Sequence, residues 1–276
     1  MKTAVVTDST SDIPNELAER YSITVIPNIL VMDGQSLEDG KNISREEFYE
    51  RLPFLKTQPT TASAPAGAFQ TIYERLLHQG IEHIISIHPP AQLSGILNAA
   101  TIAAQNFNGF VKVIDSGYVS LGMGFQAIEA AECALKGLAF DAILERIAAI
   151  RARVRVVAML DTLEFVRRSG RVSWARARLG QIFDFKPLIE LREGKIMSLG
   201  EARTRRRGIE RLKTGLENLG PLQKLAIVHT NAERDAHRFL NNLQIQVGSS
   251  PLIVNVTTVI GTHVGPNGLG YIVVCQ

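Results

Sequence analysis

The stretch Ala4-Val5-Val6-Thr7-Asp8-Ser9-Thr10-Ser11-Asp12-Ile13-Pro14 decides the fold class of this chain. An apolar run typical of a buried strand passes directly into four hydroxyl side chains and two carboxylates. Ile13-Pro14 then indicates the start of a helix. Open α/β sheets bind ligands outside the carboxyl ends of their strands, so the stretch predicts both a sheet and a ligand-binding edge.

The first half of the chain continues this alternation of strands and helices. The predicted strands are 3–7, 24–31, 83–87 and 111–115. The predicted helices are 13–21, 45–51, 66–78, 94–106, 122–136 and 140–154. The alternation predicts a mostly parallel sheet with helices on both faces, a three-layer α/β/α domain over residues 1–155.

The second half groups its strands and has fewer helices. The predicted strands are 156–160, 187–191, 195–199, 224–229, 252–259 and 271–275. Two long helices are expected at 204–219 and 232–243, and Leu191–Ile196 has the glycine turn of a hairpin. This grouping predicts an α+β domain over residues 156–276.

Length and composition limit the classes of protein. The chain has 276 residues, 45% of them hydrophobic and 21% charged, with a net charge of +3. That charge does not by itself imply a nucleic-acid-binding protein. Cys133 and Cys275 match no metal or redox spacing, which together with the lack of a signal peptide predicts a cytoplasmic protein with reduced thiols. No apolar run approaches the roughly 20 residues that span a bilayer.

Thr61 and Ser94 are the first candidate binding residues. Each precedes a predicted helix, where the first-turn N–H groups and the helix dipole favour a carboxylate or a phosphate. Their hydroxyl groups add hydrogen-bond donors without charge. Ordinary helix N-capping explains the same residues, and the sequence leaves both interpretations open.

A second candidate is the stretch from Gly261 to Gly270, which holds four glycines, a proline and an Asn-Gly pair. This composition predicts an irregular loop with left-handed backbone positions. His263 in such a loop suits donation to an anion or a role in phosphoryl transfer. A hairpin turn containing a hydrogen-bonded histidine is the alternative.

Arginines gather in two segments. The first contains Arg167, Arg168 and Arg171, and the second runs from Arg203 to Arg207. Such runs bind phosphate groups, lipid head groups or acidic partners, and they also form solvated faces without a ligand. Few aromatic residues lie among these arginines, which argues against nucleic-acid binding.

Motifs for other chemistry are absent from the sequence. It has no Gly-x-Gly-x-x-Gly after the first strand, no phosphate-binding Walker loop and no Gly-x-Ser-x-Gly elbow. Asp8, Asp12, Asp39 and Asp115 suit Mg²⁺, but scattered acids at strand ends also cap helices or brace loops. We therefore expect no metal and no cofactor, and the hydroxyl-rich clusters suggest a site that holds an anion rather than one that transforms a substrate.

These segments together give the chain a resemblance to the DegV family of bacterial fatty-acid-binding proteins. The segments that carry it, in chain order, are Thr7–Asp12, Asp39-Gly40, Thr60-Thr61, Leu93-Ser94-Gly95, Val113–Ser116, Asp161–Phe165, Gly170–Ser173, Lys186-Pro187 and Gly261–Pro266. The chain departs from the family pattern at Ala62, at Asn267 and at Ile96-Leu97.

The resemblance implies a lipid tunnel between two domains. It places a long-chain fatty acid carboxylate against Thr61, Ser94, Gly95 and His263. Ser9, Arg171, Arg203 and Thr262 would face the head group or a partner.

The resemblance further implies that the protein has no activity of its own. It would present the carboxylate to a separate ATP-binding fatty acid kinase, which makes acyl phosphate for phospholipid metabolism, and it is compatible with transient contact with a membrane. Two other hypotheses stay open from the residues. One is an enzyme acting on a phosphorylated or carboxylated metabolite with His263 as acid/base, and the other is a nucleic-acid or regulatory binder that uses the arginines.

Overall fold

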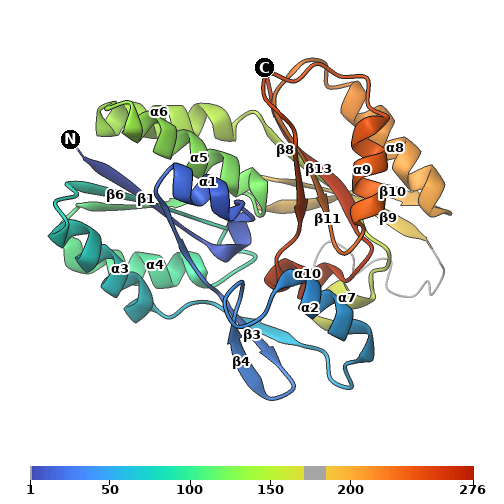
Figure 1. The fold of residues 1–276 in the computed structure, drawn as a ribbon, viewed down its shortest axis with the longest axis horizontal. Coiled ribbons are helices and arrows are strands. Elements are labelled where there is room, and N and C mark those ends of the chain that lie inside the picture. The colour runs from blue at the N-terminus through green and yellow to red at the C-terminus, as the bar shows by residue number, and fades with distance from the viewer. Residues whose placement is uncertain (1, 171–184) are drawn as a thin grey trace. The chain divides into compact units, whose positions relative to one another are not determined.

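The computed structural model describes residues 2–170 and 185–276 (Figure 1). The chain divides into two compact units. The first unit comprises Met1–Ile29 and Ala62–Ala152, and the second comprises Leu30–Thr61 and Arg153–Gln276.

A parallel sheet forms the centre of the first unit. Its strands are β1 (Thr3–Asp8), β2 (Ile23–Ile26), β6 (His83–His88) and β7 (Val111–Asp115), in the order β2-β1-β6-β7. Every neighbouring pair is parallel. The parallel sheet predicted from the strand–helix alternation is confirmed.

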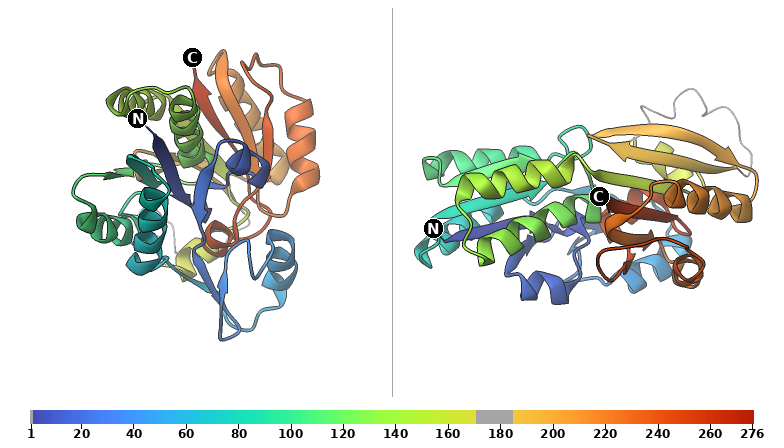
Figure 2. Two further views of the ribbon diagram at one scale, coloured as in Figure 1. Left: turned by 60° about the vertical axis from the view of Figure 1, so that its left-hand side comes forward. Right: turned by 90° about the horizontal axis from the view of Figure 1, so that it is seen from above.

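Helices cover both faces of this sheet (Figures 1 and 2). They are α1 (Asn15–Arg20), α3 (Ala66–His78), α4 (Ile96–Ala104), α5 (Leu121–Leu135) and α6 (Phe140–Arg151). On one face, side chains of α3 and α4 such as Phe69 and Ala100 pack against Val6 and Ile84 of the sheet. On the other face α5 packs against β1, β2 and β6, with α6 beside it.

The second unit contains a six-stranded sheet. Its strands are β8 (Val154–Met159), β9 (Lys186–Arg192), β10 (Lys195–Ala202), β11 (Leu222–His229), β12 (Leu252–Asn255) and β13 (Leu269–Cys275). The order is β10-β9-β8-β13-β11-β12, and only the pair of β11 with β12 is parallel. The predicted hairpin joins β9 to β10, with Glu193 and Gly194 at φ 48° and 77°.

Two helices cover one face of that sheet. They are α8 (Arg205–Glu217) and α9 (Glu233–Asn241). Leu212 and Leu216 of α8 and Phe239 of α9 share one buried cluster with strand residues such as Ile227 and Tyr271. This unit matches the predicted α+β architecture of the second half.

The sequence predicts a single division of the chain near residue 155. In the structure, residues 30–61 also belong to the second unit, because they pack with it. They form β3 (Ile29–Met32), β4 (Gln35–Glu38), α2 (Arg45–Arg51), η2 (Leu52–Phe54) and β5 (Thr60–Ala62). Leu30, Phe48 and Tyr49 form a buried cluster against which Phe165 of α7 (Glu164–Arg168) packs. That contact is between residues over a hundred positions apart in the sequence, so local patterning does not reveal it.

Two predicted strands are shorter than expected. The strand predicted over 24–31 is interrupted at Pro27-Asn28, since proline has no N–H for a strand ladder. The strand predicted over 252–259 ends at Asn255, and Thr258–Val264 form helix α10 instead. None of the helices in the described part of the chain combines the length and apolarity needed to cross a bilayer.

His229 ends β11 and is only 5% exposed. Its Nδ1 accepts the backbone N–H of Ala232 at 3.2 Å, which requires an unprotonated ring nitrogen. Burial lowers the pKa of His229 from its ordinary value of 6.5.

The free energy of unfolding is therefore expected to fall as the pH drops below about 6.5, because the unfolded chain takes up this proton before the folded chain does. His229→Gln should weaken that pH dependence, whereas His78→Gln at the exposed end of α3 in the first unit should preserve it. Urea unfolding at a series of pH values measures the difference. Parallel curves for the wild type and His229→Gln would contradict the assignment.

Candidate functional site

The hydroxyl of Thr61 meets the imidazole of His263. Thr61 lies in β5, His263 lies in the last turn of α10, and Oγ1 is 3.0 Å from Nε2. Both residues belong to the second unit and both are half-buried. Two residues 202 positions apart in the sequence thus form one polar pair at the end of a helix.

The prediction that His263 lies in an irregular loop is wrong, because the residue belongs to α10. Gly261, Thr262 and His263 are helical, so the irregular backbone begins only at Gly265 (φ 76°) and Asn267 (φ 62°). The glycine content of this stretch predicts a loop, but Gly261 lies inside a short helix. Gly261 is small because the aromatic rings of α2 press against it: a β-carbon there would lie 2.4 Å from Oη of Tyr49.

The N-terminal end of α10 is held by Asp39. Oδ1 of Asp39 accepts the hydroxyl of Thr258 at 2.7 Å, and Oδ2 accepts the hydroxyl of Thr257. All three residues are buried. Thr257 caps the helix, and Asp39 braces the two threonine side chains at its start.

Thr262 is fully buried, and its hydroxyl donates to the backbone carbonyl of Thr258 at 2.8 Å. Its predicted head-group or partner-facing role would require it to give up that hydrogen bond. Gly265 follows the helix and packs against the ring of Phe165. A β-carbon on Gly265 would lie 2.3 Å from Cδ2 of that ring.

Ser94 and Gly95 lie in the first unit, at the start of α4. Oγ of Ser94 accepts the N–H of Ile96 at 3.3 Å and lies 3.5 Å from Oγ of Ser63. Gly95 is the N-cap residue of α4, and Ser63 Oγ is 3.6 Å from where its β-carbon would stand. Ser94 therefore bonds to the helix start as the capping interpretation expects, whereas Thr61 caps no helix and bonds to His263.

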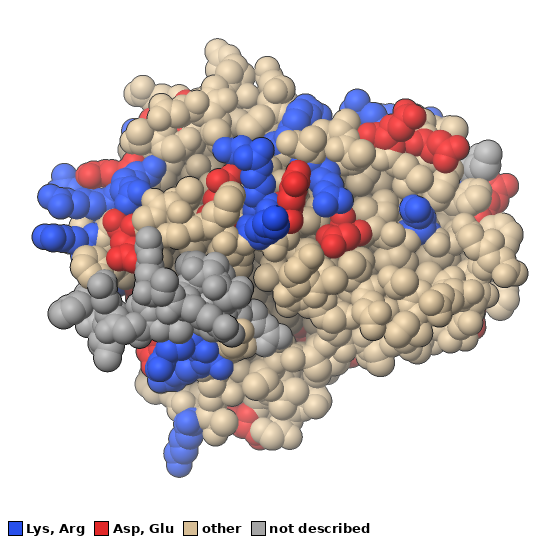
Figure 3. Space-filling model, turned by 180° about the vertical axis from the view of Figure 1, so that it is seen from behind, with Lys and Arg blue, Asp and Glu red and all other residues tan. Residues whose placement is uncertain are grey.

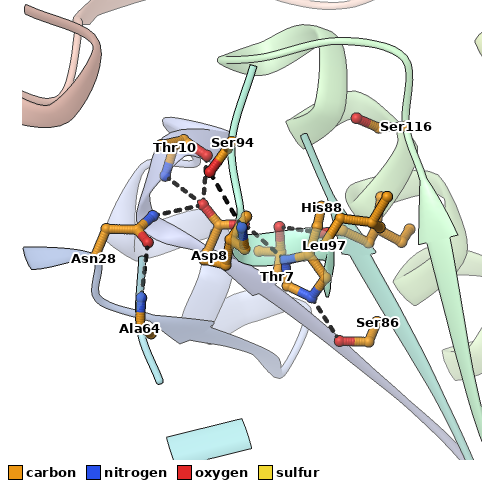
Figure 4. A network of polar contacts seen from close by, with 12 residues as sticks. Thr7, Asp8, Thr10, Asn28, Ala64, Ser86, His88, Ser94, Leu97 and Ser116 are labelled. Carbon is orange, nitrogen blue, oxygen red and sulfur yellow. Dashed lines mark hydrogen bonds and ion pairs between the residues drawn. The ribbon is translucent and has the colours of Figure 1, made fainter. Parts of the chain in front are cut away.

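The opening cluster surrounds the fully buried carboxylate of Asp8 (Figure 4). Oδ1 accepts the N–H of Thr10 at 3.0 Å, the hydroxyl of Thr10, and Nδ2 of Asn28 at 2.9 Å. Asn28 also accepts the N–H of Ala64 at 3.3 Å and donates its own N–H to Ser9 Oγ at 3.2 Å. The hydroxyl of Ser9, a predicted head-group residue, is thus bound within the first unit.

A second set of contacts continues from Asp8 across the sheet. Oδ2 lies 2.7 Å from Nδ1 of His88, Nε2 of His88 lies 2.7 Å from Oγ of Ser86, and Tyr73 donates to Ser86 at 2.8 Å. None of these side chains is exposed, and burial raises the pKa of Tyr73. The order Asp–His–Ser resembles that of a hydrolase triad, but Ser86 accepts from a buried tyrosine and faces no solvent.

The predicted basic residues lie in different surroundings. Arg203 follows β10 and is exposed, and Arg171 lies outside the described residues. Arg205 pairs with Asp235 at 2.6 Å and Arg206 with Glu210 at 3.2 Å. On the face drawn in Figure 3, basic side chains lie beside acidic ones rather than in one separate positive surface. Among residues 2–170 and 185–276, no three His, Cys, Asp or Glu side chains are grouped to hold a metal ion.

Comparison with known proteins identifies the family. A model described as "Uncharacterised protein, DegV family" matches residues 2–276. The chain belongs to the DegV family. A DegV domain-containing protein of Streptomyces coelicolor is 34% identical over 98% of this chain and 97% of its own length, and one from Caldanaerobacter subterraneus is 31% identical over the same shares.

Solved DegV structures share the fold. A DegV family protein from Thermus thermophilus, described by its fatty acid binding, has a TM-score of 0.92 and 28% identity, with 100% of both chains covered. DegV of Bacillus subtilis, described as a fatty acid binding protein, has a TM-score of 0.87 and 29% identity, again with 100% of both chains covered.

Several residues that organise this DegV chain escaped the sequence analysis. They are Asn28, Ser63, Ser86 and His88. His88 ends a strand and precedes Pro89-Pro90, and Asn28 follows the proline that interrupts a strand. Their position at strand ends is the sequence feature that could have identified them.

Gly265→Ala is expected to destabilise the second unit more than its backbone angle alone explains. The backbone of Gly265 has φ 76° and ψ 178°, a region almost restricted to glycine that costs another residue about 1–3 kcal/mol, and the ring of Phe165 adds a clash. Gly80→Ala is the control for a positive φ without a clash, because Gly80 has φ 83° and open space around it. Denaturant unfolding compares the two, and equal losses would show that Phe165 moves aside freely.

Proposed function

We propose that this chain binds a long-chain fatty acid and presents its carboxylate to a separate ATP-dependent fatty acid kinase. The observation that carries the proposal is the Thr61–His263 pair, found in a chain whose family includes fatty-acid-binding structures. The imidazole orients the threonine hydroxyl, and the hydroxyl donates to a carboxylate oxygen. Ser94 and Gly95 supply the second part of the head-group site.

Affinity in this proposal comes from the acyl chain. About fifteen methylene groups at about 0.8 kcal/mol each give on the order of 12 kcal/mol on burial, before the costs of binding. The head-group donors are uncharged, and each hydrogen bond from them to the ionised carboxylate has a net value of about 1.5–3 kcal/mol. They orient the carboxylate and leave it charged for attack on the γ-phosphate of ATP.

Arg203 is proposed to face the kinase partner rather than the lipid. It is exposed, and the run 203–209 that it opens contains no acidic residue. An exposed cation contributes to the association rate and the orientation of an acidic or phosphate-bearing partner. Arg203→Ala should therefore impair partner-dependent phosphorylation more than lipid binding.

The direct test is denaturing extraction of the purified protein followed by mass spectrometry. A stoichiometric free fatty acid supports the proposal and gives the chain length. An empty protein that also fails to take up fatty acid from solution contradicts it, as does one that holds an ester, a nucleotide or a sugar phosphate.

The head-group assignment has its own test. Thr61→Val and Ser94→Ala should each weaken fatty acid binding about tenfold or more, the effect of losing one hydrogen bond to a charged group. Thr71→Val is the control, because the Thr71 hydroxyl bonds to the Gly67 carbonyl on the exposed face of α3. Titration of the delipidated protein with a fluorescent fatty acid measures affinity. Unchanged affinity in the Thr61→Val/Ser94→Ala double variant would refute the assignment.

A further inference from the structure

We infer that Asp39 is a positioning residue for His263: its buried carboxylate fixes the start of α10 and so sets the imidazole against Thr61. The consequence for fatty acid binding rests on the proposed function. The hydrogen bonds of Asp39 go to Thr257 and Thr258 at the start of α10, so its effect on His263 passes through the helix.

The contacts of Asp39 are specific. The side chain is 5% exposed, and each carboxylate oxygen receives a different hydroxyl, that of Thr258 at 2.7 Å and that of Thr257. Both threonines are completely buried. A buried carboxylate is tolerated only when donors surround it, so the three side chains hold one another in a single arrangement.

Charge reinforces this arrangement. Thr257 is the N-cap residue of α10, and its Oγ1 accepts the N–H of Val259 at 3.4 Å. The negative carboxylate of Asp39 therefore stands at the positive end of the helix. The contact joins the end of β4 to α10 across more than 200 residues of sequence, so no local preference would create it.

The helix transmits the position of its first turn to His263. His263 lies five positions after Thr258, which is roughly 7.5 Å along a helix. The Thr262 hydroxyl ties the last turn to the carbonyl of Thr258 at 2.8 Å. Tyr49 holds the preceding carbonyl of Val256 at 3.1 Å and packs on Gly261, so α10 has little freedom to readjust.

The experiment compares Asp39→Ala with Asp39→Asn. Alanine removes both hydrogen bonds. Asparagine keeps both, because one threonine hydroxyl rotates to accept from the new amide. With delipidated protein and a fluorescent fatty acid, Asp39→Ala should raise Kd about tenfold or more, and Asp39→Asn should stay within about threefold of wild type.

A second readout separates positioning from stability. The imidazole resonances of His263 in NMR spectra should move in Asp39→Ala and remain in place in Asp39→Asn. Leu212→Ala is the stability control, since its core cluster contains no residue of α10. It should lower Tm while leaving both Kd and the His263 resonances unchanged.

Three results would overturn the inference. They are wild-type affinity and wild-type His263 resonances in Asp39→Ala, an equal rise of Kd in Leu212→Ala, and failure of Asp39→Asn to restore both readouts. If the wild type itself binds no fatty acid, the proposed function fails instead, and the His263 resonances alone still test the positioning role.

Discussion

The buried carboxylate of Asp8 is the constraint on which the first unit depends. It lies at the carboxyl end of β1 with no exposure to solvent, where an unpartnered charge would cost several kcal/mol. Thr10, Asn28 and His88 satisfy it from three separate segments. The loop after β1, the break after β2 and the end of β6 are therefore fixed by one group, and Asn28 extends that order to the backbone of Ala64.

The second unit uses a carboxylate in the same way. Asp39 gathers the hydroxyls of Thr257 and Thr258 and starts α10, at whose other end His263 meets Thr61. In each unit a buried acid organises hydroxyl-bearing segments without itself facing solvent. This separation of tasks explains why so many Ser and Thr residues accompany so few exposed acids in the motifs that carry the family resemblance.

Much of the fold was predictable because it follows from local patterns. Apolar runs placed β1, β6 and β7, and the helices predicted over 45–51 and 66–78 match α2 and α3. Contacts between distant segments were not predictable. The packing of residues 30–61 with the second unit involves Phe48, Tyr49 and Phe165, and the start of the helix that carries His263 is bound by Asp39. For the site, residue type identified Thr61 and His263, but only the tertiary structure pairs them.

The chemistry of the pair fits an anion that must stay ionised. A lysine or arginine in direct contact would hold a carboxylate more strongly, but it would also stabilise the ground state of a nucleophile. A threonine hydroxyl oriented by a histidine donates one directed hydrogen bond and leaves the charge on the ligand. Under the proposed function, burial of an acyl chain would supply ample affinity, so the head-group contacts need only be directional. The carboxylate of Asp39 then has a clear task in that proposal, because such contacts select a geometry only when the groups that make them are held rigidly in place.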